Sequence, residues 1–222
     1  MNTLTRKLIA KELYVNRGFM VMGSAAGIVS ILIATQGQIG FNIGCLTWLT
    51  TIIAMGVMLA IYGVMHERKE HSLEFVLSLP VSIADYVRAK VIGLWICFLV
   101  VWLVSSVAAL LLVYLKESVP DGIAPYTVLL CGFMLANFGV LLCGMFEARS
   151  EAASTAMIVV TNMGISVFMF TVGPMNGIKQ TMWNAAPSWN ETFWIVLVCE
   201  LAVLLASFAL PFFLSARRRD FF

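Results

Sequence analysis

Residues 66–90 read His66-Glu-Arg-Lys-Glu-His-Ser-Leu-Glu-Phe-Val-Leu-Ser-Leu-Pro-Val-Ser-Ile-Ala-Asp-Tyr-Val-Arg-Ala-Lys90. This is the one long charged segment in a chain of 222 residues that is 61% hydrophobic and only 12% charged. Soluble domains carry about a quarter charged residues. The composition therefore predicts an integral membrane protein, in which this segment is a loop between two membrane spans.

The first part of the segment is predicted to be a short amphipathic helix. Three acidic residues share one face at helical spacing, namely Glu67, Glu70 and Glu74. Apolar residues form a ridge on another face, namely Leu73, Val76 and Leu77. A solvated linker would explain the charges but not the ridge, whereas a helix with these two faces suits a groove on a partner protein. We favour docking.

A corner and a second helix follow. Pro80 disfavours helical backbone at Leu79 and is expected to end the first helix there. Ser82 can cap a new helix, with Asp85 three residues later in a capping-box arrangement. The new helix meets no breaker and is expected to continue through Val91 into the next apolar run.

The pattern Glu67-Arg68-Lys69-Glu70-x-Ser72-Leu73-Glu74-x-x-Leu77-Ser78-Leu79-Pro80-Val81-Ser82, with Tyr86 and Lys90 after it, resembles the first cytoplasmic loop of permease subunits of ABC-2 type transporters. A small residue, usually Gly, is common in that family where this chain has His71. The similarity extends more loosely to Lys11, Glu12 and Leu13 and to the six-span layout. It implies that the segment is a coupling helix on which a separate ATP-binding subunit docks, through Glu67, Glu70, Leu73, Glu74, Val76, Leu77, Leu79 and Pro80.

The resemblance also sets expectations for the whole chain. Residues 1–222 would form a single transmembrane permease domain in the plasma membrane, paired with a second permease copy or a homologue and surrounded by membrane lipid, without nucleic acid. The chain carries no phosphate-binding Gly-x-x-x-x-Gly-Lys-Ser/Thr loop, so it is not expected to be an ATPase or another enzyme. It would bind no cofactor itself, and ATP and Mg would sit in the partner.

Six apolar runs are long enough to cross a membrane, which takes about 20 residues. They are Phe19–Thr35, Phe41–Met65, Val91–Leu115, Thr127–Phe146, Ala153–Val172 and Phe193–Leu214. Residues 36–40 are predicted to form the turn between the first two. Residues 1–17 are weakly amphipathic, and the resemblance implies an interfacial helix there.

The basic residues predict the orientation. With both termini in the cytoplasm, Lys116 and Lys179 are the only two of the 14 Lys and Arg residues left outside. The segment 66–90 then lies in the cytoplasm and the loop 173–192 lies outside, with tryptophans that mark the membrane interface. On the inner side, Glu147 and Arg149 lie in a short charged turn, which by resemblance would be a secondary contact with the ATP-binding subunit.

Few polar groups interrupt the spans. Glu200 is the single acidic residue within a span. It is either a carboxylate in the transport pathway or a residue packed within the bundle. Asn137 and Asn162 are weaker pathway candidates, because such residues more often join helices. Two pairs of glycines four residues apart allow close helix approach without indicating the partner, namely Gly23 with Gly27 and Gly40 with Gly44.

The fold class is therefore an all-α membrane protein with six spans. The favoured function is the permease subunit of an ATP-driven exporter of a hydrophobic or amphipathic substrate such as a peptide. An ATP-independent channel or a membrane scaffold is the alternative, but it leaves the patterned segment unexplained. A membrane-embedded enzyme is weaker still, because one glutamate and scattered asparagines are few catalytic groups.

Overall fold

The computed structural model describes residues 3–66, 83–116, 119–148 and 150–217. These residues form helices and turns, without a strand among them. The elements are α1 (Thr3–Ala34), α2 (Gly37–Ala60), the π-helical turn η1 (Ile61–Met65), α5 (Ile83–Leu115), the 3-10 turn η2 (Asp121–Ile123), α6 (Ala124–Glu147), α7 (Glu151–Val172), α8 (Asn176–Lys179) and α9 (Glu191–Arg217). Six of the helices are long and apolar enough to cross a membrane, which confirms the predicted spans and the all-α class.

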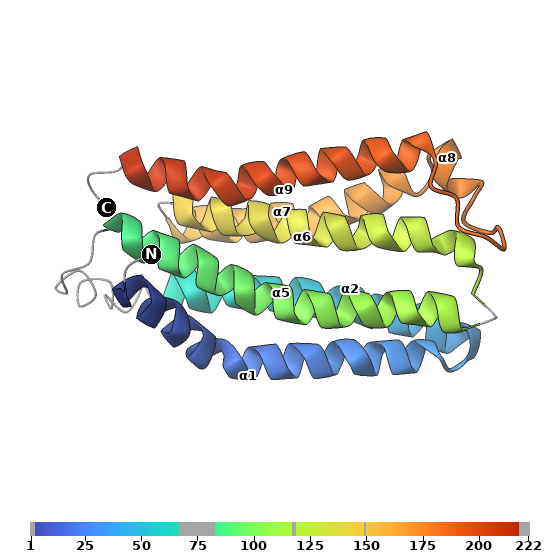
Figure 1. The fold of residues 1–222 in the computed structure, drawn as a ribbon, viewed down its shortest axis with the longest axis horizontal. Coiled ribbons are helices and arrows are strands. Elements are labelled where there is room, and N and C mark those ends of the chain that lie inside the picture. The colour runs from blue at the N-terminus through green and yellow to red at the C-terminus, as the bar shows by residue number, and fades with distance from the viewer. Residues whose placement is uncertain (1–2, 67–82, 117–118, 149, 218–222) are drawn as a thin grey trace.

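The six long helices lie roughly along one direction, so their ends gather at two opposite sides (Figure 1). The start of α1, the end of η1 after α2, the start of α5 and the end of α9 lie at the same side, which we call the terminal end. The turn between α6 and α7 is also there, whereas the turn from α1 to α2 and helix α8 lie at the far end. The ends of the charged segment 66–90 therefore lie beside the two ends of the chain.

The N-terminal segment and the first span form one helix, α1, which changes direction in its first half (Figure 1). The bent portion before the span corresponds to the predicted helix in residues 1–17. No proline interrupts the sequence there, and a Cβ on Gly18 would meet nothing within 4 Å, so the helix continues through the bend. The segment is thus helical, but it is not a separate element.

The turn between α1 and α2 is tighter than predicted. The expected turn covered residues 36–40, but α1 ends at Ala34 and α2 begins at Gly37. Gly37 has a φ of 80°, the left-handed conformation that glycine adopts without a steric penalty. This one residue reverses the chain, so residues 38–40 are helical, contrary to the prediction.

Helices α1, α2 and α5 form one closely packed layer. A side chain at Gly23 or Gly27 would collide with Val101 or Ser105 of α5, so this glycine pair marks the contact between α1 and α5. The second pair, Gly40 and Gly44, lets α2 approach Ile33 and Ala34 of α1. The indole nitrogen of Trp48 on α2 donates a hydrogen bond of 3.1 Å to the Ser105 carbonyl of α5.

Helices α6, α7 and α9 form the second layer (Figure 1). Within it, α6 packs closely along α9, and Gly139 of α6 accommodates the Ser207 hydroxyl of α9. The contacts between the layers are sparser than the main contacts within them. They join α2 to α6, α5 to α6 and α5 to α9. The ring of Phe98 on α5 stacks on Phe138 of α6 at 4.0 Å across this seam.

Candidate functional site

A buried ion pair joins α1 to α5 near the terminal end. Lys90 Nζ lies 2.8 Å from Glu12 Oε1, and the two side chains are only 3% and 6% exposed. Lys90 lies about two turns into α5, so it follows closely after residues 67–82. The pair therefore ties α1 to the first part of α5.

Neighbouring residues of both helices make room for this pair. A Cβ on Gly93 would come within 2.7 Å of Glu12 Cβ, so the small residue lets the glutamate lie directly against α5. Buried Asn16 donates a hydrogen bond of 2.9 Å from its amide nitrogen to the Glu12 carbonyl. Lys11 Nζ lies 3.7 Å from the same carboxylate oxygen, but its side chain is half exposed. Glu12 is thus fixed from both sides.

The predicted docking residues lie outside the described residues. They are Glu67, Glu70, Leu73, Glu74, Val76, Leu77, Leu79 and Pro80. Arg149 also lies outside them, whereas Glu147 is half-buried as the last residue of α6. Glu147 is at the terminal end, the same end as His66 and Ile83, which flank the docking segment.

Glu200 borders a cavity of about 300 Å³ at the seam between the layers. Its lining comes from α5, α6 and α9 and is apolar except for a few groups. The Glu200 side chain lies against α6 at Gly132, where a Cβ would collide with its Oε2. The residue is only 7% exposed, and neither carboxylate oxygen has a hydrogen-bond partner among the residues that the structure describes.

Ser106 and Trp102 of α5 are the other polar side chains of this lining. The Ser106 hydroxyl is buried, and the Cys131 thiol is the one group near it that can act as a weak partner among the described residues. The Trp102 indole nitrogen instead donates 2.9 Å to the Cys131 carbonyl, which fixes the ring at the cavity wall. The surface of the cavity is therefore apolar, and the oxygen atoms of Glu200 and Ser106 are buried directly behind it.

The cavity lies in the half of the bundle away from the terminal end. Glu200 is about 14 Å along α9 from its start at Glu191, and Ser106 is at a similar distance from the end of α5 at Leu115. Both of these helix ends are at the far end of the bundle (Figure 1). The carboxyl group is therefore well inside the span, where an ionisable side chain is costly without a function or a partner.

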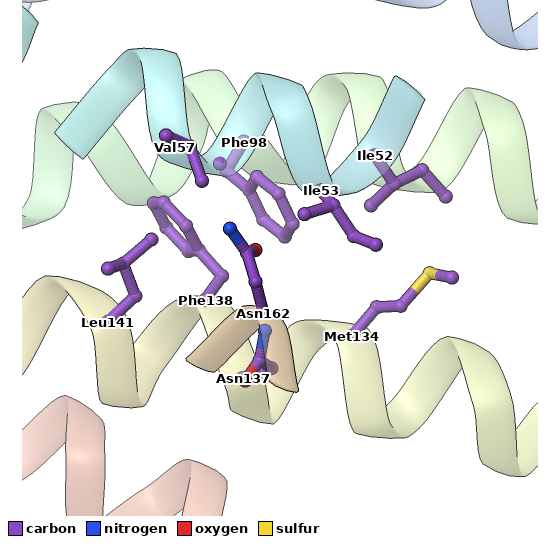
Figure 2. Close-up of a pocket in the computed structure, with 10 residues that line it drawn as sticks. Ile52, Ile53, Val57, Phe98, Met134, Asn137, Phe138, Leu141 and Asn162 are labelled. Carbon is purple, nitrogen blue, oxygen red and sulfur yellow. The ribbon is translucent and has the colours of Figure 1, made fainter. Parts of the chain in front are cut away.

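Asn137 and Asn162 line a different cavity, which has room for about one water molecule at roughly 10 Å³. Figure 2 shows Asn162 beside Phe138 and below Phe98 and Ile53, with Asn137 close by. Asn137 is five residues from Gly132 on α6, which is about 140° around the helix. The structure thus brings the two asparagines together but places them on another side of α6 from Glu200.

Sequence reasoning missed the residues that position Glu200 and Lys90. Gly132 and Gly139 of α6 are seven residues apart, as are Glu200 and Ser207 of α9, and each glycine receives one polar side chain. This matched spacing was a visible signal for the contact between α6 and α9. The pairing of Glu12 with Lys90 across 78 residues left no such signal. Among the described residues, no three His, Cys, Asp or Glu side chains gather to hold a metal ion.

Comparison with known proteins identifies the family. Neither the curated proteins nor the solved structures gave a match. A family model described as "ABC-2 family transporter protein" matches residues 7–218, nearly the whole chain. This match agrees with six membrane-spanning helices and with the pattern of residues 66–90. The chain therefore belongs to the ABC-2 family of transporter proteins, as a membrane-spanning permease.

Proposed function

We propose that this chain is the permease subunit of an ATP-driven exporter and that a separate ATP-binding subunit docks on residues 66–82. One observation carries the proposal. Helix α5 begins directly after the docking segment, is tied to α1 by the buried pair of Glu12 and Lys90, and runs without interruption to Leu115. A force applied to the docking segment would therefore act on a continuous helix.

The length of α5 suits this role. Its 33 residues span about 50 Å, so a displacement at Ile83 is carried through the bundle to the far end. On the way the helix passes the cavity, to which it contributes Trp102 and Ser106. ATP and Mg²⁺ bound by the partner would supply the energy, and α5 would convey the motion to the cavity. Glu147 and Arg149 would form a second contact with the partner.

The proposed orientation follows from charge. Of the 14 Lys and Arg residues, Lys116 at the end of α5 and Lys179 in α8 belong to the far end, so by the positive-inside rule the terminal end would face the cytoplasm of a cell whose plasma membrane holds the protein. A second permease copy or a homologue would complete the transporter. Support comes from the large apolar surfaces that α7 and α9 leave exposed, which lipid or another permease can cover.

Co-purification with an ATP-binding subunit tests the docking proposal. Leu77→Arg places a charge in the apolar ridge and should reduce association at least ten-fold without changing membrane insertion. His71→Arg is the matched control, because the predicted helix places residue 71 opposite that ridge, and it should leave association intact. Equal association of wild type and Leu77→Arg would contradict docking through the ridge, and the absence of any ATPase partner would contradict the ATP-driven function.

A further inference from the structure

We propose that the cavity around Glu200 is a binding site for a hydrophobic molecule that carries a single protonated amine. The Glu200 carboxylate and the Ser106 hydroxyl lie directly behind the wall of the cavity, and a turn of the Glu200 side chain would bring its carboxylate to the amine. The alkyl part would lie along the apolar wall formed by α5, α6 and α9. That this molecule is also the transported cargo rests on the function proposed above, but the binding site itself does not.

The first argument is the unsatisfied carboxyl group. Glu200 is only 7% exposed, and in the described part of the chain neither of its carboxylate oxygens has a hydrogen-bond partner. A buried polar group without hydrogen bonds is costly, and a buried charge is far more costly unless it is paired. No lysine, arginine or histidine is among the residues that line the cavity. A ligand that donates hydrogen bonds and carries positive charge supplies what the residues lining the cavity do not.

The second argument is that the chain keeps space for the carboxyl group. Gly132 of α6 leaves room where any other side chain would collide with Glu200 Oε2. The cavity beside it, at about 300 Å³, is at the lower end of the volumes typical for small-molecule sites. The carboxyl group therefore has a space of its own on α6, next to a cavity large enough for a small ligand.

The third argument concerns access. Leu103, Val107 and Leu201 line the cavity and are also 56%, 47% and 47% exposed on the side of the bundle. The site therefore opens sideways between α5 and α9, at the depth of the lipid tails. A molecule dissolved in the membrane can enter there without crossing water, which favours an amphiphile over a small hydrophilic ion.

The chemistry of the walls selects an amine over other head groups. An anionic head group would be repelled by the carboxylate, and a neutral alcohol would supply one donor for two carboxylate oxygens. A primary ammonium has three donors and a positive charge, enough for both oxygens of Glu200 and for the Ser106 hydroxyl. A charge-assisted hydrogen bond of this kind is about twice as strong as a neutral one.

The test is native mass spectrometry of the full chain released from detergent, with dodecylamine, dodecanol and dodecanoate as probes of equal chain length. Wild type should bind one dodecylamine at least ten-fold more tightly than either of the other probes. Glu200→Gln should remove this preference. Glu191→Gln, the same change at the exposed start of α9, should keep it.

Three outcomes would overturn the proposal. One is equal binding of dodecylamine and dodecanol to wild type, a comparison that needs no variant. Another is undiminished dodecylamine preference in Glu200→Gln. The third is a wild-type dimer that binds no dodecylamine and dissociates in Glu200→Gln, which would show that a second copy covers Glu200. As a further variant, Gly132→Ala keeps the carboxyl group but displaces it, and it should weaken the amine preference as well.

A second measurement separates this proposal from the docking proposal. In the complex with the ATP-binding subunit, dodecylamine should stimulate ATP hydrolysis at least two-fold in wild type and not in Glu200→Gln, which should still assemble. The Leu77→Arg variant should no longer associate with the ATP-binding subunit but should still bind dodecylamine. If dodecylamine binds but never changes hydrolysis, the amine is not cargo. If the Leu77→Arg variant still associates with the ATP-binding subunit, the docking proposal fails while the amine site stands.

Discussion

Replacing Lys90 by methionine should cost the protein about 3 kcal/mol of unfolding free energy. At 2.8 Å, two unit charges attract each other by about 6 kcal/mol at an effective dielectric constant of about 20, and much of this offsets their dehydration. Removing one partner leaves the other charge buried, which costs about 3–5 kcal/mol in folded proteins. We expect the lower end of this range, because Lys11 lies 3.7 Å from the Glu12 carboxylate and compensates in part.

The assay is reversible unfolding in mixed micelles by titration with dodecyl sulfate, followed by tryptophan fluorescence. Arg88→Met is the matched control, since Arg88 lies 4.0 Å from Asp85 but is 55% exposed, and it should cost less than about 1 kcal/mol. Combining Glu12→Leu with Lys90→Met should restore stability to within about 1 kcal/mol of wild type. A cost for Lys90→Met no larger than that for Arg88→Met would refute the reasoning, because it would mean that the pair is accessible to water.

Three further changes, with Gly18→Ala as a control, test the packing of the first layer by the same unfolding assay. Gly27→Ala should cost about 1–3 kcal/mol, because the new methyl group collides with Ser105, whereas Gly18→Ala meets nothing and should be neutral or stabilising by up to about 1 kcal/mol. Equal effects of these two changes would contradict the close contact of α1 with α5. Gly37→Ala should cost about 1–2 kcal/mol, because its φ of 80° disfavours any side chain with a Cβ. Trp48→Phe should cost about 1 kcal/mol by removing the hydrogen bond to the Ser105 carbonyl, and an unchanged midpoint would contradict that bond.

The spans could be predicted from sequence because a membrane imposes a length and an apolar composition on each helix. Their ends could not be predicted as well. The sequence predicts the turn after α1 at residues 36–40, because these residues separate the first two apolar runs. The positive φ of Gly37 completes the reversal earlier, and residues 38–40 continue as helix. Hydropathy does not report such a backbone detail.

The candidate site shows a sharper limit. The sequence identified Glu200 as an unusual residue, because a charge within an apolar run is visible without a structure. It did not indicate what Glu200 faces, since the helix on which Gly132 lies is about 70 residues away along the chain. The same holds for the choice of partner of Lys90. Local patterns report faces of helices, but the pairing of those faces is set by packing of the whole bundle.

The closest helix contacts in the molecule lie within the two layers described above and not between them. Gly27 and Trp48 fix α1 and α2 to α5, and Gly132 and Gly139 fix α6 to α9, whereas the seam between the layers has fewer close contacts. The group of α1, α2 and α5 and the pair of α6 and α9 therefore act as two plates, and a change in the angle between these plates is expected to disturb the fewest close contacts. Opening the plates would enlarge the space beside Glu200 and closing them would empty it, without unfolding any helix. Such a motion would let a single chain change the volume of its own cavity.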